Sequence, residues 1–194
     1  YLIERYQRDR ADARALARTM INQFRERNFI LSRYGAHLYG FVHRTFLEYF
    51  CAEAIVGKFK HDQRWPFDRL RDLFEQHWAD PSWREVLRLV AGALHERHSA
   101  QLIDLLTRAV NTPWPPGEFA QPPWNLALAV QCLAEVRNPH SEVAKPAETL
   151  LRHVILLLEH CVSINDSDTM ALIEEEILPA ARAIGTSWPG RAAL

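Results

Sequence analysis

Residues Tyr39–Ile55, "YGFVHRTFLEYFCAEAI", decide how the rest of the chain is interpreted. The segment begins as a strand-like run, reaches a histidine and continues as a strongly apolar helix. His43 stands at the junction between the two. A histidine in that place serves as a catalytic base, a metal ligand, a helix cap or a contact to a bound group. The residues around it must decide among these roles.

A helix and a hairpin are predicted before this junction. Six apolar residues recur at helical spacing and predict a helix over about 11–27 with one buried face. They are Ala13, Leu16, Ala17, Met20, Ile21 and Phe24. Residues Phe29–Val42 contain two short apolar runs around a turn at Tyr34–Gly35, which predicts a β-hairpin. Helix, hairpin and helix in this order are how a winged-helix domain ends when an extra helix follows the wing.

The helix after the hairpin is apolar on more than one side, so we expect it to join two modules. Beyond residue 60 the pattern is helical throughout. Helices are predicted over 67–77, from Ser82 to 94, and over 100–110, 124–136, 146–162 and 169–184, with a break near Pro179. Ser82 and Glu85 have the spacing of a capping box. Helix starts about 20 to 25 residues apart favour stacked antiparallel pairs of the HEAT type, and an irregular helical domain remains the alternative.

The predicted fold is therefore mostly α. A partial winged helix (helix–β-hairpin–helix) occupies residues 1–60, and an α-helical, HEAT-like or irregular domain occupies 61–194, with an internal break near the proline-rich loop 111–123. The first residues, "YLIERYQRDR", are typical of the end of a helix. We therefore expect the chain to be a fragment of a longer protein.

Composition indicates the cellular compartment and argues against a membrane or nucleic acid as a partner. Cys51, Cys132 and Cys161 lie far apart in apolar surroundings, which predicts buried thiols in a reducing compartment, here the cytoplasm. The longest strongly apolar run, Val154–Leu158, is far shorter than the roughly 18 residues of a membrane span, so no membrane is expected. A formal net charge of -1 gives no overall attraction to nucleic acid.

No metal site is predicted. His95 and His98 in "HERH" are three residues apart, whereas the zinc-protease helix needs histidines four apart. They also fall near a predicted helix end, where histidines commonly cap carbonyl groups. His37, His43 and Cys51 lie close in sequence without a compact ligand pair.

No catalytic residue is predicted either. The chain has no G-x-S-x-G elbow, and none of its cysteines lies in an exposed, electropositive setting. The "GKFK" segment at Gly57 lacks the earlier glycine and the Ser/Thr of a phosphate-binding loop. We therefore do not expect this chain to be an enzyme by itself.

A local basic bias raises the question of DNA binding. Residues 1–44 contain nine arginines and four acidic residues, and Arg14, Arg18 and Arg25 lie opposite the apolar face of the predicted helix. Asp12 and Glu26 dilute this field. A solvated or domain-facing basic stripe is the favoured interpretation, so nucleic acid is not expected as a partner.

The segment "RNFILSRYGAHLYGFVHRTFLEYFCAEAI" resembles the end of the NACHT module in NLR-like ATPases of the STAND class. Their pattern is roughly H-x-[ST]-F-x-E-[YF]-[FL]-x-A after a short hairpin. The matching residues here are His43, Thr45, Phe46, Glu48, Tyr49, Phe50 and Ala52. The later "DPSWREVLRLVAGAL" is similar to a segment that follows in bacterial members. The resemblance covers about residues 13–94.

The resemblance implies a role for His43. In this family the winged-helix histidine contacts the β-phosphate of ADP. The preceding ATPase core holds the nucleotide, which is either ADP or ATP with Mg. The implied partners are that upstream NACHT core in cis, an unknown activating ligand, and further copies of the protein on activation. The helical region would serve ligand sensing or autoinhibition, in antiviral or stress defence. Glu48 is expected to be a pairing group on the helix surface or between domains.

Two alternatives remain open on the sequence. One is a DNA-binding winged-helix regulator with a helical ligand domain, and the other is a plain helical protein-interaction scaffold.

Overall fold

The computed structural model describes residues 3, 9–26, 30–35, 38–62, 64–109, 121–136, 141–185 and 188. The chain is mostly helical with a small two-stranded antiparallel sheet, so the predicted fold class and the helix–hairpin–helix order are confirmed. It divides into two compact units, 1–50 and 51–194. The division falls inside helix α3 (Arg44–His61), before the boundary expected near residue 60.

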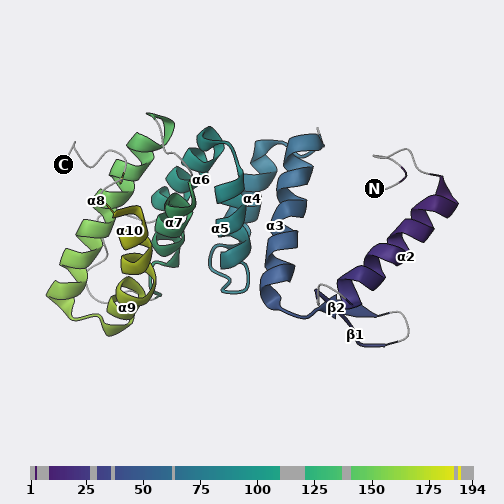
Figure 1. Cartoon of the computed structure of the whole chain (residues 1–194). Coiled ribbons are helices and arrows are strands. Elements are labelled where there is room, and N and C mark those ends of the chain that lie inside the picture. Colours follow the sequence, from purple (N-terminus) through teal and green to yellow (C-terminus); the bar gives the residue numbers. More distant parts are fainter. Residues whose placement is uncertain are drawn as a thin grey trace. The chain divides into compact units, whose positions relative to one another are not determined.

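The hairpin unit, residues 1–50, contains helix α2 (Arg10–Glu26), strands β1 (Leu31–Arg33) and β2 (Tyr39–Phe41), and the first turns of α3 (Figure 1). The Asp9 carboxylate accepts hydrogen bonds from the backbone N–H groups of Ala11 and Asp12, at 2.7 and 2.8 Å, and so caps α2. The strands are antiparallel, with Leu31 opposite Phe41. A Cβ at Gly40 would lie 2.9 Å from the Tyr34 ring, so the close approach of that ring favours glycine.

The apolar face predicted for α2 is only partly covered in the described part of the chain. Ala13 is buried, whereas Leu16 and Met20 are 40% and 39% exposed. The helical period was predicted correctly, but the burial of the whole face was not. Periodicity reports which side chains share a face, and it contains no information about what packs there.

The helical unit, residues 51–194, begins with the second half of α3 and continues with a series of helices. These are α4 (Phe67–His77), α5 (Arg84–Ala93), α6 (Glu96–Arg108), α7 (Trp124–Glu135), α8 (Ser141–Ile164), α9 (Ser167–Leu172), the π-helix η1 (Ile173–Ile177) and α10 (Leu178–Ile184). Helix α6 packs between α4 and α8, while α7 packs between α5 and the η1–α10 segment (Figure 1). Contacts between alternate helices make two layers, as in stacked helix pairs.

The core lies between these two layers. Its fully buried side chains include Phe74, Leu87, Leu102, Leu126 and Leu157, one from each of five helices. Burying a side chain of this size stabilises the fold by about 1.5–3 kcal/mol relative to leaving it in water. These apolar contacts, rather than helix propensity, hold the layers together.

Polar side chains in this core complete the ends of neighbouring helices. Ser99 donates its hydroxyl to the Ala91 carbonyl at 2.7 Å, and Asn125 donates its amide to the Leu106 carbonyl at 2.7 Å. Both side chains are buried. The last carbonyls of a helix have no partner within it, so these bonds satisfy groups that would otherwise be buried without one.

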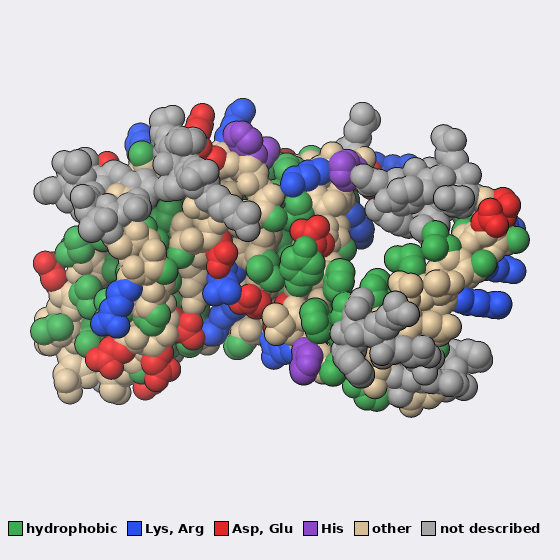
Figure 2. Space-filling model, viewed as in Figure 1, with side chains coloured by type: hydrophobic (Ala, Val, Ile, Leu, Met, Phe, Trp, Pro, Cys, Tyr) green, Lys and Arg blue, Asp and Glu red, His purple; other side chains and the backbone are tan. Residues whose placement is uncertain are grey.

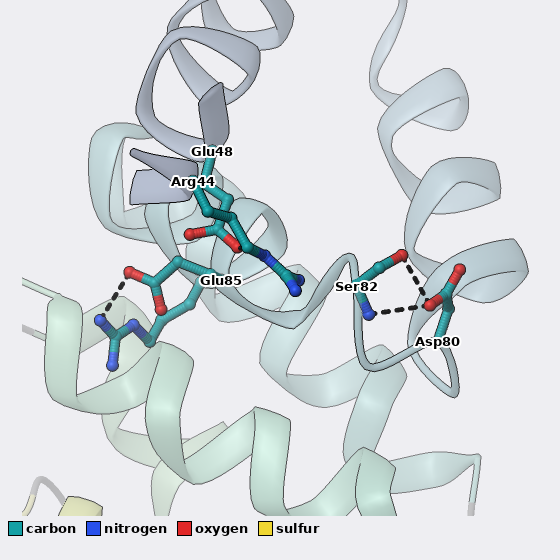
Figure 3. Close-up of polar contacts among 6 residues, drawn as sticks. Arg44, Glu48, Asp80, Ser82 and Glu85 are labelled. Atoms are coloured by element: carbon teal, nitrogen blue, oxygen red, sulfur yellow. Dashed lines mark hydrogen bonds and ion pairs between the residues drawn. The ribbon is translucent and has the colours of Figure 1, made fainter. Parts of the chain in front are cut away.

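The capping box predicted at Ser82 and Glu85 is wrong. Helix α5 is preceded by Trp83, and no side chain caps it. The Asp80 carboxylate instead accepts from both the backbone N–H and the hydroxyl of Ser82, at 2.8 and 2.7 Å (Figure 3). Glu85 accepts from Arg88 within α5 at 2.8 Å. Asp80, two positions before Ser82, takes the hydrogen bonds of the Ser82 N–H and hydroxyl. The spacing of Ser82 and Glu85 does not reveal this competing acceptor.

The starts of two helices also differ from the sequence pattern. Helix α6 begins at Glu96 rather than near 100, and α8 begins at Ser141 and contains Pro146 instead of starting there. The predicted break near Pro179 is confirmed, and its form is the π-helix η1, which leads directly into that proline. Proline lacks an N–H and its ring crowds the preceding turn, and a widened turn relieves both effects.

Candidate functional site

His43 lies between β2 and α3, with its imidazole exposed. Its backbone carbonyl accepts from the N–H of Phe46 at 3.1 Å, and the two rings lie 6.0 Å apart at 50°. Within the described part of the chain no hydrogen bond occupies the imidazole nitrogens of His43.

Aromatic contacts fix the backbone on both sides of His43. The rings of Phe41 and Phe50 stack at 5.6 Å and 23°, and Tyr49 packs edge-on against Phe50 at 5.4 Å. The stack joins β2 to the second turn of α3 and so fixes the turn that carries His43. We call this turn, with Phe41 and Phe50, the braced corner. Leu47, by contrast, is 53% exposed and takes no part in these aromatic contacts.

Glu48 forms an ion pair with Arg44 one turn earlier, at 2.6 Å between Oε1 and Nε (Figure 3). The Glu48 side chain is 12% exposed and that of Arg44 is 65% exposed. This position agrees with the pairing role expected for Glu48.

The arginines of α2 form an exposed stripe. Arg14 and Arg18 lie one turn apart and are exposed, whereas the side chain of Arg25 lies outside the described residues. Figure 2 shows basic side chains projecting from α2, while acidic and basic side chains are mixed on this face of the helical unit. The stripe is therefore confined to one helix.

The two histidines of "HERH" have separate structural roles. His95 precedes α6, and its Nδ1 accepts from the backbone N–H of Arg97 at 3.3 Å. It therefore caps the start of a helix, where the sequence pattern predicted a helix end. His98 packs between Phe59 and Phe67, with ring centroids 5.0 and 5.1 Å away. Burial lowers the pKa of His98, and the nearby charges of Arg97 and His95 lower it further.

The three cysteines are free thiols, as expected. Cys132 and Cys161 are buried, and Cys51 is half-buried. Burial raises the pKa of the Cys132 thiol well above its usual range, and burial together with Asp166 raises that of Cys161 to about 11. Neither thiol forms the thiolate that nucleophilic chemistry needs near neutral pH.

Two adjoining hollows on the α4, α6 and α8 side of the helical unit were not predicted from the sequence. One, between α6 and α8, has a volume of about 330 Å³, and the other, between α4 and α6, about 280 Å³. Arg108 lines both. The sequence carries a signal for the first, since Arg97, Gln101, Asp104 and Arg108 are polar residues at helical spacing on one face of α6.

Comparison with protein-family models, curated proteins and solved structures finds no match to this chain. None of the helices in the described ranges is long and apolar enough to cross a membrane. Within the same ranges, no three histidine, cysteine or acidic side chains gather as a metal site would require. His37, one residue considered for such a site, lies outside them.

Proposed function

We propose that this chain is the later part of the winged-helix domain of a NACHT-type STAND ATPase, followed by a helical sensor domain. The observation that carries the proposal is His43, an exposed imidazole at a corner braced by Phe41 and Phe50. The order helix, hairpin, helix around it supports the winged-helix interpretation. The chain itself is proposed to have no catalytic activity.

In the proposed mechanism, an imidazole N–H of His43 donates a hydrogen bond to the β-phosphate of ADP. The nucleotide, with Mg when it is ATP, is held by an ATPase core encoded upstream of Tyr1. A hydrogen bond to a charged phosphate contributes about 1.5–3 kcal/mol. It stabilises the resting state only while ADP is bound, because the β-phosphate is terminal in ADP and is linked to the γ-phosphate in ATP. Exchange of ADP for ATP removes this preference, so the population shifts to an open form that assembles into an oligomer.

The braced corner explains why one hydrogen bond could control a whole domain. The stack of Phe41 on Phe50 and the ion pair of Arg44 with Glu48 tie His43 to α3, which continues into the helical unit. A movement of the histidine away from the phosphate is therefore coupled to a movement of its helix. Binding of the activating ligand to the helical unit would favour or oppose this movement. The proposed setting is a defence response in the cytoplasm.

The test is His43→Ala in the full-length protein. We expect the variant to lose bound ADP about tenfold to a hundredfold faster, because the phosphate loses a charge-assisted donor. The measurement is the ADP content of the purified protein and the release rate of a fluorescent ADP analogue. His61→Ala removes an exposed histidine from the far end of α3 and serves as the matched control.

Unchanged ADP content and release in the His43 variant would contradict the proposed contact. The sequence upstream of Tyr1 gives an independent check, since the proposal requires a G-x-x-x-x-G-K-[ST] phosphate loop there.

A second candidate, DNA binding by the winged helix, is favoured by the exposed Arg14 and Arg18. It predicts a steep loss of duplex affinity as salt rises, because phosphate contacts release counterions. A gel-shift salt titration, with Arg14→Glu/Arg18→Glu as the comparison, separates the two candidates.

A further inference from the structure

The two hollows on the α4, α6 and α8 side differ in chemistry. The α4–α6 hollow is mostly apolar, with Trp78 and Leu105 in its lining. The α6–α8 hollow is lined mainly by polar and charged side chains, among them Arg97, Gln101 and Lys145. Arg108 stands between them, so an apolar site and a charged site lie next to each other across α6.

The apolar hollow has room for one large side chain. Trp78 and Leu105 are only partly buried, although both pack against the core, so each keeps part of its apolar surface open. A ligand side chain placed there would remove that surface from water, at about 25 cal/mol per Å² of apolar area. A volume of about 280 Å³ is small for a drug-sized molecule and suits a single anchoring residue.

The charged hollow contains two cations that are in no ion pair with another described residue. Arg97 and Lys145 are exposed and form no ion pair within the described part of the chain. Arg108 pairs with Asp104 at 2.9 Å, but its side chain is 78% exposed. An ion pair as exposed as this one contributes little, so Arg108 is easily redirected to a ligand. Three basic groups are therefore within reach of an acidic group in this hollow.

The same hollow also contains hydrogen-bond acceptors. Pro146 has no N–H, so the Glu142 carbonyl does not receive its usual bond from the following turn. Both residues line the hollow, as does Gln101, whose amide both donates and accepts. The hollow therefore offers donors and acceptors beside an apolar pocket, and a cluster of basic side chains is one of the recurring ways in which proteins bind acidic peptide motifs.

We propose that these two hollows together bind an extended peptide segment that carries one large apolar side chain and a nearby acidic residue. The apolar side chain occupies the space beside Trp78 and Leu105, and the acidic group lies between Arg97 and Lys145. Nucleic acid is disfavoured, because Asp104 and Glu142 would face a continuous run of phosphates. The proposal concerns a surface distant in sequence from His43 and stands or falls independently of the nucleotide contact.

The test begins with a phage-displayed random dodecapeptide library selected against the full chain at about 50 mM salt. We expect enriched sequences to share an aromatic or large aliphatic residue and an Asp or Glu within a few positions. One such peptide, labelled with fluorescein, is then titrated by fluorescence anisotropy. The Arg97→Glu/Lys145→Glu variant should bind it about tenfold or more weakly, because two attractions become repulsions.

The matched control is Arg69→Glu/Arg152→Glu, which makes the same change of charge at exposed positions outside both hollows. This variant should keep the affinity of the unmodified chain within about twofold. Leu105→Gln tests the apolar hollow and should weaken the peptide by a similar factor to the charge reversal, with circular dichroism verifying its fold. The proposal is overturned if no sequence is enriched, if both charge variants behave alike, or if a single-stranded oligonucleotide competes better than unlabelled peptide.

Discussion

The hairpin unit and the helical unit differ in how many of their described side chains are buried. Among the described side chains of residues 1–50, Ala13 is the buried one, whereas the helical unit has a continuous core that includes Leu87 and Leu102. The described part of the hairpin unit therefore buries far less apolar surface than the helical unit, and most of the stabilisation from buried side chains belongs to the helical unit.

A pair of identical substitutions tests this difference most strongly. Leu87→Ala, in the helical core, should lower the free energy of unfolding by about 2–5 kcal/mol, because it removes a fully buried side chain and leaves a cavity. Leu47→Ala, at 53% exposure in the hairpin unit, should change it by no more than about 0.5 kcal/mol. Urea denaturation followed by circular dichroism measures both. Similar losses for the two variants would mean that the hairpin unit has a core comparable to that of the helical unit.

Hydrogen bonds from side chains to helix carbonyls allow a second comparison. Asn125→Ala should cost about 1–3 kcal/mol, because the buried Leu106 carbonyl loses its donor at 2.7 Å. Thr19 makes an equivalent bond to the Ala15 carbonyl on the exposed surface of α2, at 3.1 Å. Thr19→Ala should be neutral within about 0.5 kcal/mol, since water replaces the hydroxyl and alanine favours the helix. An equal cost at both positions, in the same urea experiment, would show that burial is not the deciding factor.

The smallest effect is expected from pH. The pKa of His98 in the folded chain is below its usual value, so as pH falls through about 6.5 the unfolded chain binds a proton before the folded chain does. Stability is therefore complete above that pH and declines below it, by at most about 1.4 kcal/mol per pH unit for one proton. His98→Phe, which keeps an aromatic ring between Phe59 and Phe67, should remove this part of the decline.

The control for the pH effect comes from the hairpin unit. Leu47→Ala removes an exposed side chain that carries no titratable group and should leave the decline between pH 7.5 and 5 in place. Urea midpoints at four pH values measure the slope for each variant. A slope that is unchanged in the His98 variant would assign the decline to other groups.

The element order could be predicted from sequence because it depends on local periodicity. Helix α4 was predicted with its observed ends, and the hairpin lies where the pattern placed it. Capping was less predictable, because Asp80 and not Glu85 accepts the hydrogen bond from Ser82. Residue spacing does not show which of several nearby acceptors a donor will choose. The hollows beside Arg108 depend on which helices become neighbours, and no local pattern encodes that.

The bonds that complete the ends of α5 and α6 have a consequence for how the helical unit assembles. The Ala91 carbonyl of α5 accepts from Ser99 of α6, and the Leu106 carbonyl of α6 accepts from Asn125 of α7. A truncation after α5 or α6 would therefore leave a carbonyl at the end of the last remaining helix without its side-chain donor. We therefore expect α5, α6 and α7 to form together in one cooperative transition.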